Sequence, residues 1–148
     1  MTSGLTPRNI LLVEDNPDDE ELTIRALQRS GLMNEIVVAR DGVEALDYLF
    51  GTGQYAGRNT QIQPAVVLLD LQLPRINGIE VLQRLRADDR TRFLPVVVFT
   101  SSNEQRDFVD SYSYGCNSYI CKPIDFIQFS AAVRQLGMYW LLLNEVPR

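Results

Sequence analysis

Three short, uninterrupted apolar runs constrain the fold of this chain more than any other feature of its sequence. The runs are Ile10–Val13, Ala65–Leu69 and Pro95–Phe99. None of them alternates polar with apolar residues, as a strand with one solvated face would. Strands that are buried on both faces have this composition, so the runs predict a parallel sheet covered by helices on both sides.

Segments with helical periodicity separate the runs, and two weaker strand signals lie at Glu35–Ala39 and Ser118–Cys121. The helical patterns cover residues 18–30, 42–50, 79–87, 104–114 and 125 to about 143. Residues 51–64 are polar, contain glycine and lack a clear period, so we expect a long surface loop there. Because strand and helix alternate about five times, the sequence predicts a βα-repeated α/β fold.

Length and composition are those of one globular domain. The chain has 148 residues, of which 45% are hydrophobic, enough for a single core. We expect one domain over residues 1–148, with its core at about 8–143 and no attached output domain. The net charge is −5 without a basic run, so nothing indicates binding to nucleic acid or to a membrane. No apolar stretch suits a bilayer span or a signal peptide, and we therefore expect a cytoplasmic protein.

The chain contains no histidine, which removes several kinds of chemistry. A Ser-His-Asp or Cys-His nucleophile and a zinc site with histidine ligands are excluded. The chain also cannot itself donate a phosphoryl group from phosphohistidine. Cys116 and Cys121 have neither metal-ligand nor redox-motif spacing, so we expect free thiols. Carboxylates, hydroxyls, an amine and bound ions remain to carry the function.

Polar residues follow the predicted strands at the point where each strand ends. Because the carboxyl ends of parallel strands meet at one edge of the sheet, these side chains are expected to converge. They are Glu14, Asp15, Asp70, Thr100 with Ser101 and Ser102, and Lys122.

Three carboxylates in one place repel each other unless a cation lies among them. Only oxygen ligands are available, which favours a hard ion such as Mg²⁺. Such a cluster is suited to hold a phosphoryl group covalently on one carboxylate, with the metal and Lys122 neutralising its charge. Thr100 is placed to donate a hydrogen bond to a phosphoryl oxygen.

Each of these residues has a simpler explanation when it is taken alone. Asn16 or Asp18 suits the cap of the first helix, and Thr100 suits the end of a strand. An isolated lysine such as Lys122 is usually solvated. Their joint position after separate buried strands is what favours a functional site.

With these positions in hand, the sequence resembles the receiver domain of two-component response regulators. The similarity runs from about Ile10 to Trp140. It rests on the following segments: Leu12-Val13-Glu14-Asp15-Asn16, Leu68-Leu69-Asp70-Leu71-Gln72-Leu73-Pro74, Asn77-Gly78, Thr100-Ser101-Ser102 and Cys121-Lys122-Pro123.

The resemblance implies a flavodoxin-like, doubly wound fold of five parallel strands in the order 2-1-3-4-5, with five helices. It implies that Asp70 accepts a phosphoryl group from the phosphohistidine of a histidine kinase, so the domain is a phospho-acceptor rather than an enzyme. It also implies Mg²⁺ ligands: Glu14, Asp15, Asp70 and the backbone carbonyl of Gln72. Many receivers have two aspartates where this chain has Glu14 and Asp15. Because glutamate is longer, two modes remain open for Glu14: direct contact with the metal and contact through a water molecule.

The resemblance also assigns the residues that respond to the phosphoryl group. Thr100 and Lys122 would bind its oxygens, and Tyr119 falls at the aromatic switch position. The Lys122–Pro123 bond resembles the cis peptide of the family, which would direct the lysine inward.

A closer similarity is to the small response regulators that partner cyanobacterial phytochromes. It rests on the segment from Ile10 to Asp15, the loop around Gly53-Gln54-Tyr55 and the closing Tyr139-Trp140-Leu141. It implies a light-sensing histidine kinase as the partner. The apolar cluster Tyr139–Leu143 exceeds one buried helical stripe, so we expect a homodimer, with folding back over the domain as the alternative.

Two other classes have an acid after a buried strand or an open α/β sheet. An aspartyl-phosphate hydrolase of the dehalogenase-like class usually needs a second acid two residues after the first, where this chain has Gln72. A nucleotide- or flavin-binding domain usually has a glycine-rich loop after the first strand, where this chain has acidic residues. The receiver interpretation therefore explains more of the sequence than either alternative.

Overall fold

The computed structural model describes residues 8–29, 31, 34–102, 104–122, 127–128 and 131. The strands of this part are β1 (Ile10–Val13), β2 (Ile36–Ala39), β3 (Val66–Leu69), β4 (Val96–Thr100) and β5 (Ser118–Cys121). Its helices are α1 (Pro17–Arg29), α2 (Gly42–Phe50), the short 3₁₀ helix η1 (Gly53–Tyr55), α3 (Gly78–Ala87) and α4 (Gln105–Ser113). Every predicted strand, and every predicted helix within these residues, is confirmed to within one residue at each end.

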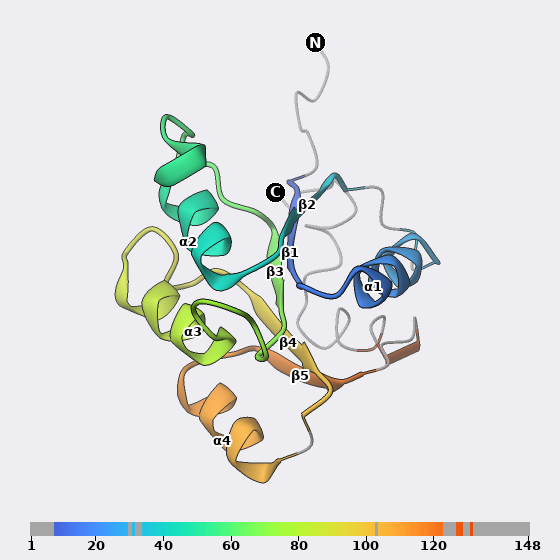
Figure 1. Ribbon diagram of the computed structural model, residues 1–148. Helices are drawn as coiled ribbons and strands as arrows, with labels where there is room; N and C mark the ends of the chain where they lie inside the picture. Colours follow the sequence, from blue (N-terminus) through green and yellow to red (C-terminus); the bar gives the residue numbers. More distant parts are fainter. Residues whose placement is uncertain are drawn as a thin grey trace, which may run out of the picture.

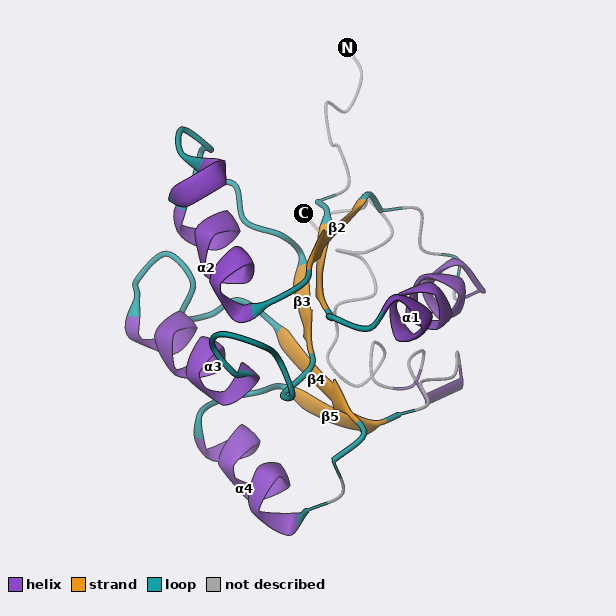
Figure 2. Cartoon of the chain, viewed as in Figure 1, coloured by secondary structure: helices purple, strands orange, loops and turns teal. Residues whose placement is uncertain are grey.

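The five strands form one parallel sheet in the order β2-β1-β3-β4-β5, as the resemblance implies. Helix α1 covers one face, and α2, α3 and α4 cover the other, so the sheet is doubly wound (Figure 1). The cartoon coloured by secondary structure shows the strands as the central layer between these helices (Figure 2). Of the predicted fifth helix, residues 125 to about 143, the structure describes only residues 127, 128 and 131, which are helical; the rest of this helix lies outside the described residues.

The core has one cluster on each face of the sheet, which explains why the apolar runs are uninterrupted. Leu12 and Leu68 point to the α1 side, where they pack with Leu27. Their strand neighbours Leu11 and Val67 point to the opposite side and pack with residues of α2 and α3. Because successive residues of a strand face opposite layers, every position in β1 and β3 is buried.

The loop between α2 and β3 has more structure than the sequence predicted. The loop contains η1, and the guanidinium of Arg58 fastens the residues after η1 to α2. Arg58 donates hydrogen bonds to the carbonyl oxygens of Tyr48 and Ile62, at 2.5 and 2.8 Å, and its guanidinium lies 4.1 Å from the centre of the Tyr48 ring. These contacts are tertiary, and hydrophobic periodicity does not predict them.

The described helices also bear on the expected absence of a membrane span. Within the part of the chain that the structure describes, none of the helices has the length and apolar character needed to cross a bilayer.

Candidate functional site

The segment after β1 presents two acids and the start of α1 at the carboxyl edge of the sheet. Glu14 is completely buried, whereas Asp15 is exposed. The side-chain oxygen of Asn16 accepts hydrogen bonds from the amides of Asp18 and Asp19, at 2.8 and 3.1 Å. Asn16 therefore caps α1, as its residue type predicted.

Asp70 follows β3 and is held by the backbone around it. Its amide donates to the carbonyl oxygen of Val13, 3.1 Å away, and its Oδ1 accepts from the amide of Gln72, also at 3.1 Å. Gly78, the first residue of α3, contacts the same turn so closely that an added Cβ would lie 2.3 Å from the Asp70 carbonyl oxygen. Strand, turn and helix together limit where the Asp70 carboxylate can point.

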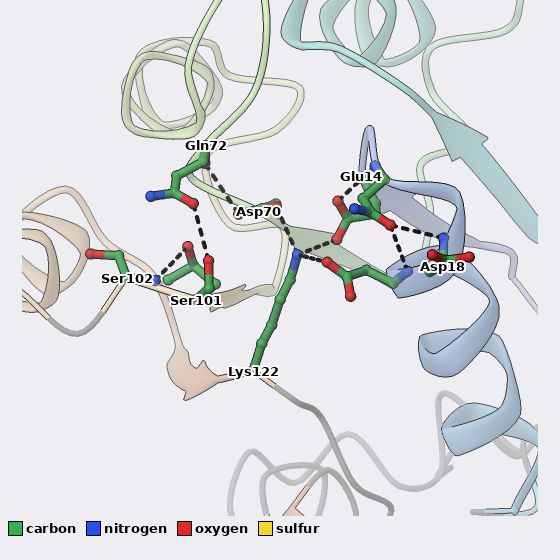
Figure 3. A network of polar contacts seen from close by, with 10 residues as sticks. Glu14, Asp18, Asp70, Gln72, Ser101, Ser102 and Lys122 are labelled. Atoms are coloured by element: carbon green, nitrogen blue, oxygen red, sulfur yellow. Dashed lines mark hydrogen bonds and ion pairs between the residues drawn. The ribbon is translucent and has the colours of Figure 1, made fainter.

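The amine of Lys122 joins the acids into one cluster. Its Nζ lies 2.5 Å from Oε1 of Glu14, 2.9 Å from Oδ2 of Asp70 and 2.9 Å from Oδ2 of Asp19. Figure 3 shows the lysine reaching from the end of β5 toward Glu14 and Asp70. Its backbone amide donates to the Thr100 carbonyl oxygen at 2.8 Å, which ties the base of the side chain to the end of β4.

Burial and hydrogen bonding shift the protonation of this cluster in opposite ways. Burial raises the pKa of Glu14 from 4.5 to about 7, against the hydrogen bonds from Lys122 and from the Asn16 amide, which lower it. Burial alone would lower the pKa of Lys122, but its hydrogen bonds to Glu14, Asp70 and Asp19 outweigh this effect and raise it. Lys122 is therefore charged at neutral pH, whereas Glu14 gains or loses its proton near pH 7.

The acids fit a hard divalent cation such as Mg²⁺. One carboxylate oxygen from each of Glu14, Asp15 and Asp70 lies within 4.8 Å of the others. In an octahedral Mg²⁺ site, adjacent ligands lie about 3.0 Å apart and opposite ligands about 4.2 Å apart, so the three side chains must move closer together to surround one ion. The donors are all oxygen, the ligand type that Mg²⁺ prefers. The expected contribution of the Gln72 carbonyl stays a prediction.

Binding of Mg²⁺ is expected to release a proton from Glu14. With a pKa of about 7, Glu14 is mostly protonated at pH 6 and mostly ionised at pH 8. The apparent affinity should therefore weaken about tenfold between pH 8 and pH 6, with about 0.9 proton released per ion at pH 6. Calorimetric titration in two buffers of different ionisation enthalpy measures this release. Glu14→Gln should abolish it, and equal proton release at both pH values would contradict the assignment.

The segment after β4 connects the site to α4 and β5. Thr100 is buried, and its Oγ1 accepts from the Ser102 amide at 3.3 Å. Ser102 donates from its hydroxyl to Asp107 at 2.5 Å, and its carbonyl oxygen accepts from the Tyr119 hydroxyl at 3.0 Å. Ser101 donates to the side chain of Gln72 at 3.1 Å (Figure 3). A movement of this segment would therefore reach Asp107 and Tyr119.

The structure thus brings together four of the predicted residues, namely Glu14, Asp15, Asp70 and Lys122. Thr100 and Tyr119 belong to the adjoining segment, linked through Ser102. The proposed cis peptide at Lys122–Pro123 involves Pro123, which lies outside the described residues.

Sequence reasoning missed Asp19. The only indication in the sequence is that Asp19 is one of three acids in the first turn of α1. Nothing in the sequence shows which of the three contacts Lys122.

The sequence profile of the response regulator receiver domain matches residues 10–134. This chain belongs to the response regulator receiver family. The match covers all described strands and helices, and the acid pair, Asp70, Thr100 and Lys122 lie within it.

Three similar receivers illustrate the range of the family. The bacteriophytochrome response regulator AtBRR is 54% identical, with a TM-score of 0.81 over 95% of this chain and 99% of that chain. Response regulator Rcp1 of Synechocystis sp. is 33% identical over 95% of this chain and 94% of its own length. Its Mn²⁺-bound crystal structure has a TM-score of 0.76, with 96% of this chain and all of that chain covered.

The third relative is named for the regulation of methanogenesis rather than for a phytochrome. The probable methanogenesis regulatory protein FilR2 of Methanothrix harundinacea is 42% identical over 95% of this chain and 88% of its own length. This receiver is thus related both to phytochrome response regulators and to a regulator of another process.

Proposed function

We propose that this receiver accepts a phosphoryl group on Asp70 from the phosphohistidine of a histidine kinase, in a Mg²⁺-dependent reaction, and acts by changing its protein-interaction surface. The observation that carries the proposal is the placement of Asp70 within 2.9 Å of the Lys122 amine, next to Glu14 and Asp15. A nucleophilic carboxylate, a fixed cation and a set of hard metal ligands then share one edge of the sheet.

The donor must come from another protein, because this chain has no histidine. In the transfer, an oxygen of Asp70 forms a bond to phosphorus as the phosphorus–nitrogen bond of the donor breaks, and the imidazole keeps that electron pair. The Lys122 ammonium faces Asp70 and offsets negative charge on the transferring group. A Mg²⁺ ion held by Glu14, Asp15 and Asp70 would supply further charge neutralisation.

The proposed change of the protein-interaction surface depends on the hydrogen bonds of Ser102. We expect the Thr100 hydroxyl to move toward the phosphoryl group and donate to it, and this movement would take its Oγ1 away from the Ser102 amide, from which it now accepts a hydrogen bond. Because Ser102 also contacts Asp107 and Tyr119, this change is expected to alter the surface of α4 and β5. The receiver is expected to exist in an inactive and an active form in equilibrium. Phosphorylation shifts this equilibrium only through contacts that differ between the two forms.

Phosphotransfer from purified histidine kinases tests the proposal. Wild type should become labelled once per chain in the presence of Mg²⁺, and Asp70→Asn should not. Chelation of Mg²⁺ should abolish labelling of the wild type. Equal labelling of wild type and Asp70→Asn would contradict the assignment of Asp70, and repeated turnover of phosphate esters would favour a hydrolase.

A phytochrome-type kinase is the partner that we propose, on the basis of the similarity to the bacteriophytochrome response regulator AtBRR. The name of FilR2 makes a kinase of another signalling system the alternative. A bacteriophytochrome kinase should label this protein to an extent that differs between its two light states. Labelling only by kinases without a light-sensing module would contradict the partner proposal while leaving Asp70 as the acceptor.

We also propose a homodimer through the apolar cluster Tyr139–Leu143, which lies outside the described residues. Sedimentation of the wild type should give a dimer at micromolar concentration. Trp140→Ala should shift the population toward monomer, because a large aromatic anchor is lost from the interface. A monomer in both proteins would contradict this proposal.

A further inference from the structure

Asp19 is a member of the Lys122 cluster that the proposed phosphoryl transfer does not use. Its Oδ2 lies 2.9 Å from Lys122 Nζ, the same distance as Oδ2 of Asp70. An ammonium group has three N–H donors, and three carboxylates surround this one. When Asp70 becomes an acyl phosphate, its own hydrogen bond from Lys122 can pass to a phosphoryl oxygen, but Glu14 and Asp19 still hold the other two N–H donors. A second hydrogen bond from Lys122 to the phosphoryl group therefore requires Glu14 or Asp19 to give way.

The three acceptors differ in how easily water can replace the lysine. The side chain of Glu14 is 0% exposed and that of Asp70 is 5% exposed, whereas that of Asp19 is 35% exposed. A buried carboxylate that loses its partner stays poorly solvated, while a half-exposed one is solvated by water. Of the two acceptors that remain carboxylates after phosphorylation, Asp19 can release Lys122 at a lower cost than Glu14.

We propose that Asp19 is a positioning residue that holds one N–H of Lys122 in the unphosphorylated receiver and yields it to the phosphoryl group, so that its carboxylate disfavours the phosphorylated state. The inference rests on the proposed acceptance of phosphate at Asp70. Two effects act in the same direction. The Asp19 carboxylate competes for Lys122, and its negative charge repels the incoming phosphoryl dianion.

Asp18 offers a matched comparison within the same turn of α1. Both acids carry the same charge, both lie in the first helical turn, and both amides donate to Asn16. Both therefore interact favourably with the N-terminus of the helix. Asp18 is exposed, and the ion pairs of Lys122 are with Glu14, Asp19 and Asp70 instead. Asp18→Asn thus removes the same charge without touching the lysine.

Equilibrium binding of beryllium trifluoride, a phosphoryl mimic, tests the inference in the presence of Mg²⁺. Lys122 is the only lysine in the sequence, so lysine-selective isotope labelling gives one NMR reporter at the site. Asp19→Asn should bind the mimic about fivefold more tightly than wild type, the effect expected for a partly exposed ion pair that no longer competes. Asp18→Asn should stay within about twofold of wild type.

Mg²⁺ titrations without the mimic separate positioning from a structural role. The Asp19 carboxylate attracts Mg²⁺ and repels the anionic mimic. Asp19→Asn should therefore bind Mg²⁺ equally well or more weakly than wild type, and bind the mimic more tightly. A merely structural Asp19 would weaken both together and lower stability more than Asp18→Asn does.

Two results would overturn the inference. One is mimic binding by Asp19→Asn that equals or falls below that of wild type. The other is equal tightening in Asp18→Asn. Failure of the proposed function has a different signature, which is an absence of mimic binding in wild type or equal binding in Asp70→Asn.

Discussion

Lys122→Ala is expected to lower the free energy of unfolding by about 3–5 kcal/mol at pH 8 without Mg²⁺. The amine is the shared partner of Glu14, Asp19 and Asp70. Its removal leaves two buried carboxylates, Glu14 and Asp70, without the cation that offsets their burial. Breaking a buried ion pair from one side costs this much because the remaining charge has neither water nor a partner.

The loss should be smaller at pH 5 than at pH 8. The folded-state pKa of Glu14 is about 7, above its ordinary value of 4.5, because burial raises it. A carboxyl group of this kind stabilises the fold below its ordinary pKa, and that contribution is lost as pH rises through the folded-state pKa. In Lys122→Ala the pKa of Glu14 should rise further, since the lysine hydrogen bond no longer lowers it. Protonation at pH 5 then relieves the unpaired charge.

Urea unfolding at pH 5 and pH 8, each with and without Mg²⁺, measures these effects. Mg²⁺ should recover part of the lost stability at pH 8, because it supplies a cation to the same acids. Arg25→Ala is the control, since Arg25 forms an exposed ion pair with Glu21 in α1. That change should cost less than about 1 kcal/mol. A loss in Lys122→Ala no greater than in Arg25→Ala would contradict the account of the cluster.

Gly78→Ala is expected to destabilise the receiver by about 2–4 kcal/mol through overpacking against backbone atoms. A Cβ at this position would lie 2.3 Å from the carbonyl oxygen of Asp70 and 2.6 Å from Cα of Leu71. Neither atom belongs to a flexible side chain that can turn away. The start of α3 and the turn that carries Asp70 must therefore separate, which also displaces the Asp70 carboxylate.

Gly57→Ala is the matched control because it isolates backbone strain from overpacking. Gly57 has a φ of 92°, but nothing lies within 4 Å of an added Cβ. Its substitution should cost about 1–2 kcal/mol and leave Mg²⁺ affinity unchanged. Gly78→Ala should lower both the urea midpoint and the Mg²⁺ affinity. A Gly78→Ala protein with wild-type stability and Mg²⁺ affinity would show that this close approach does not position Asp70.

The sequence by itself determined the sheet and the edge on which the site lies. Strands β1, β3 and β4 are buried on both faces, so their composition alone identifies them. Once the strands are parallel, Glu14, Asp70 and Thr100 must emerge at the same edge, and the position of each after its strand is a local property. The cap at Asn16 was equally local, since its side chain accepts hydrogen bonds from backbone amides two and three residues away.

Only the tertiary structure decided which acids share Lys122. Asp18 and Asp19 are adjacent in the first turn of α1, and their chemistry is the same. The rotation of α1 about its axis, set by packing of Leu27 against the sheet, brings Asp19 to the lysine. The bridge between Ser102 and Tyr119, and the tether from Arg58 to Tyr48 of α2, depend in the same way on packing between elements. Local periodicity cannot encode such contacts, because it specifies which face of an element is buried but not which distant side chain meets it.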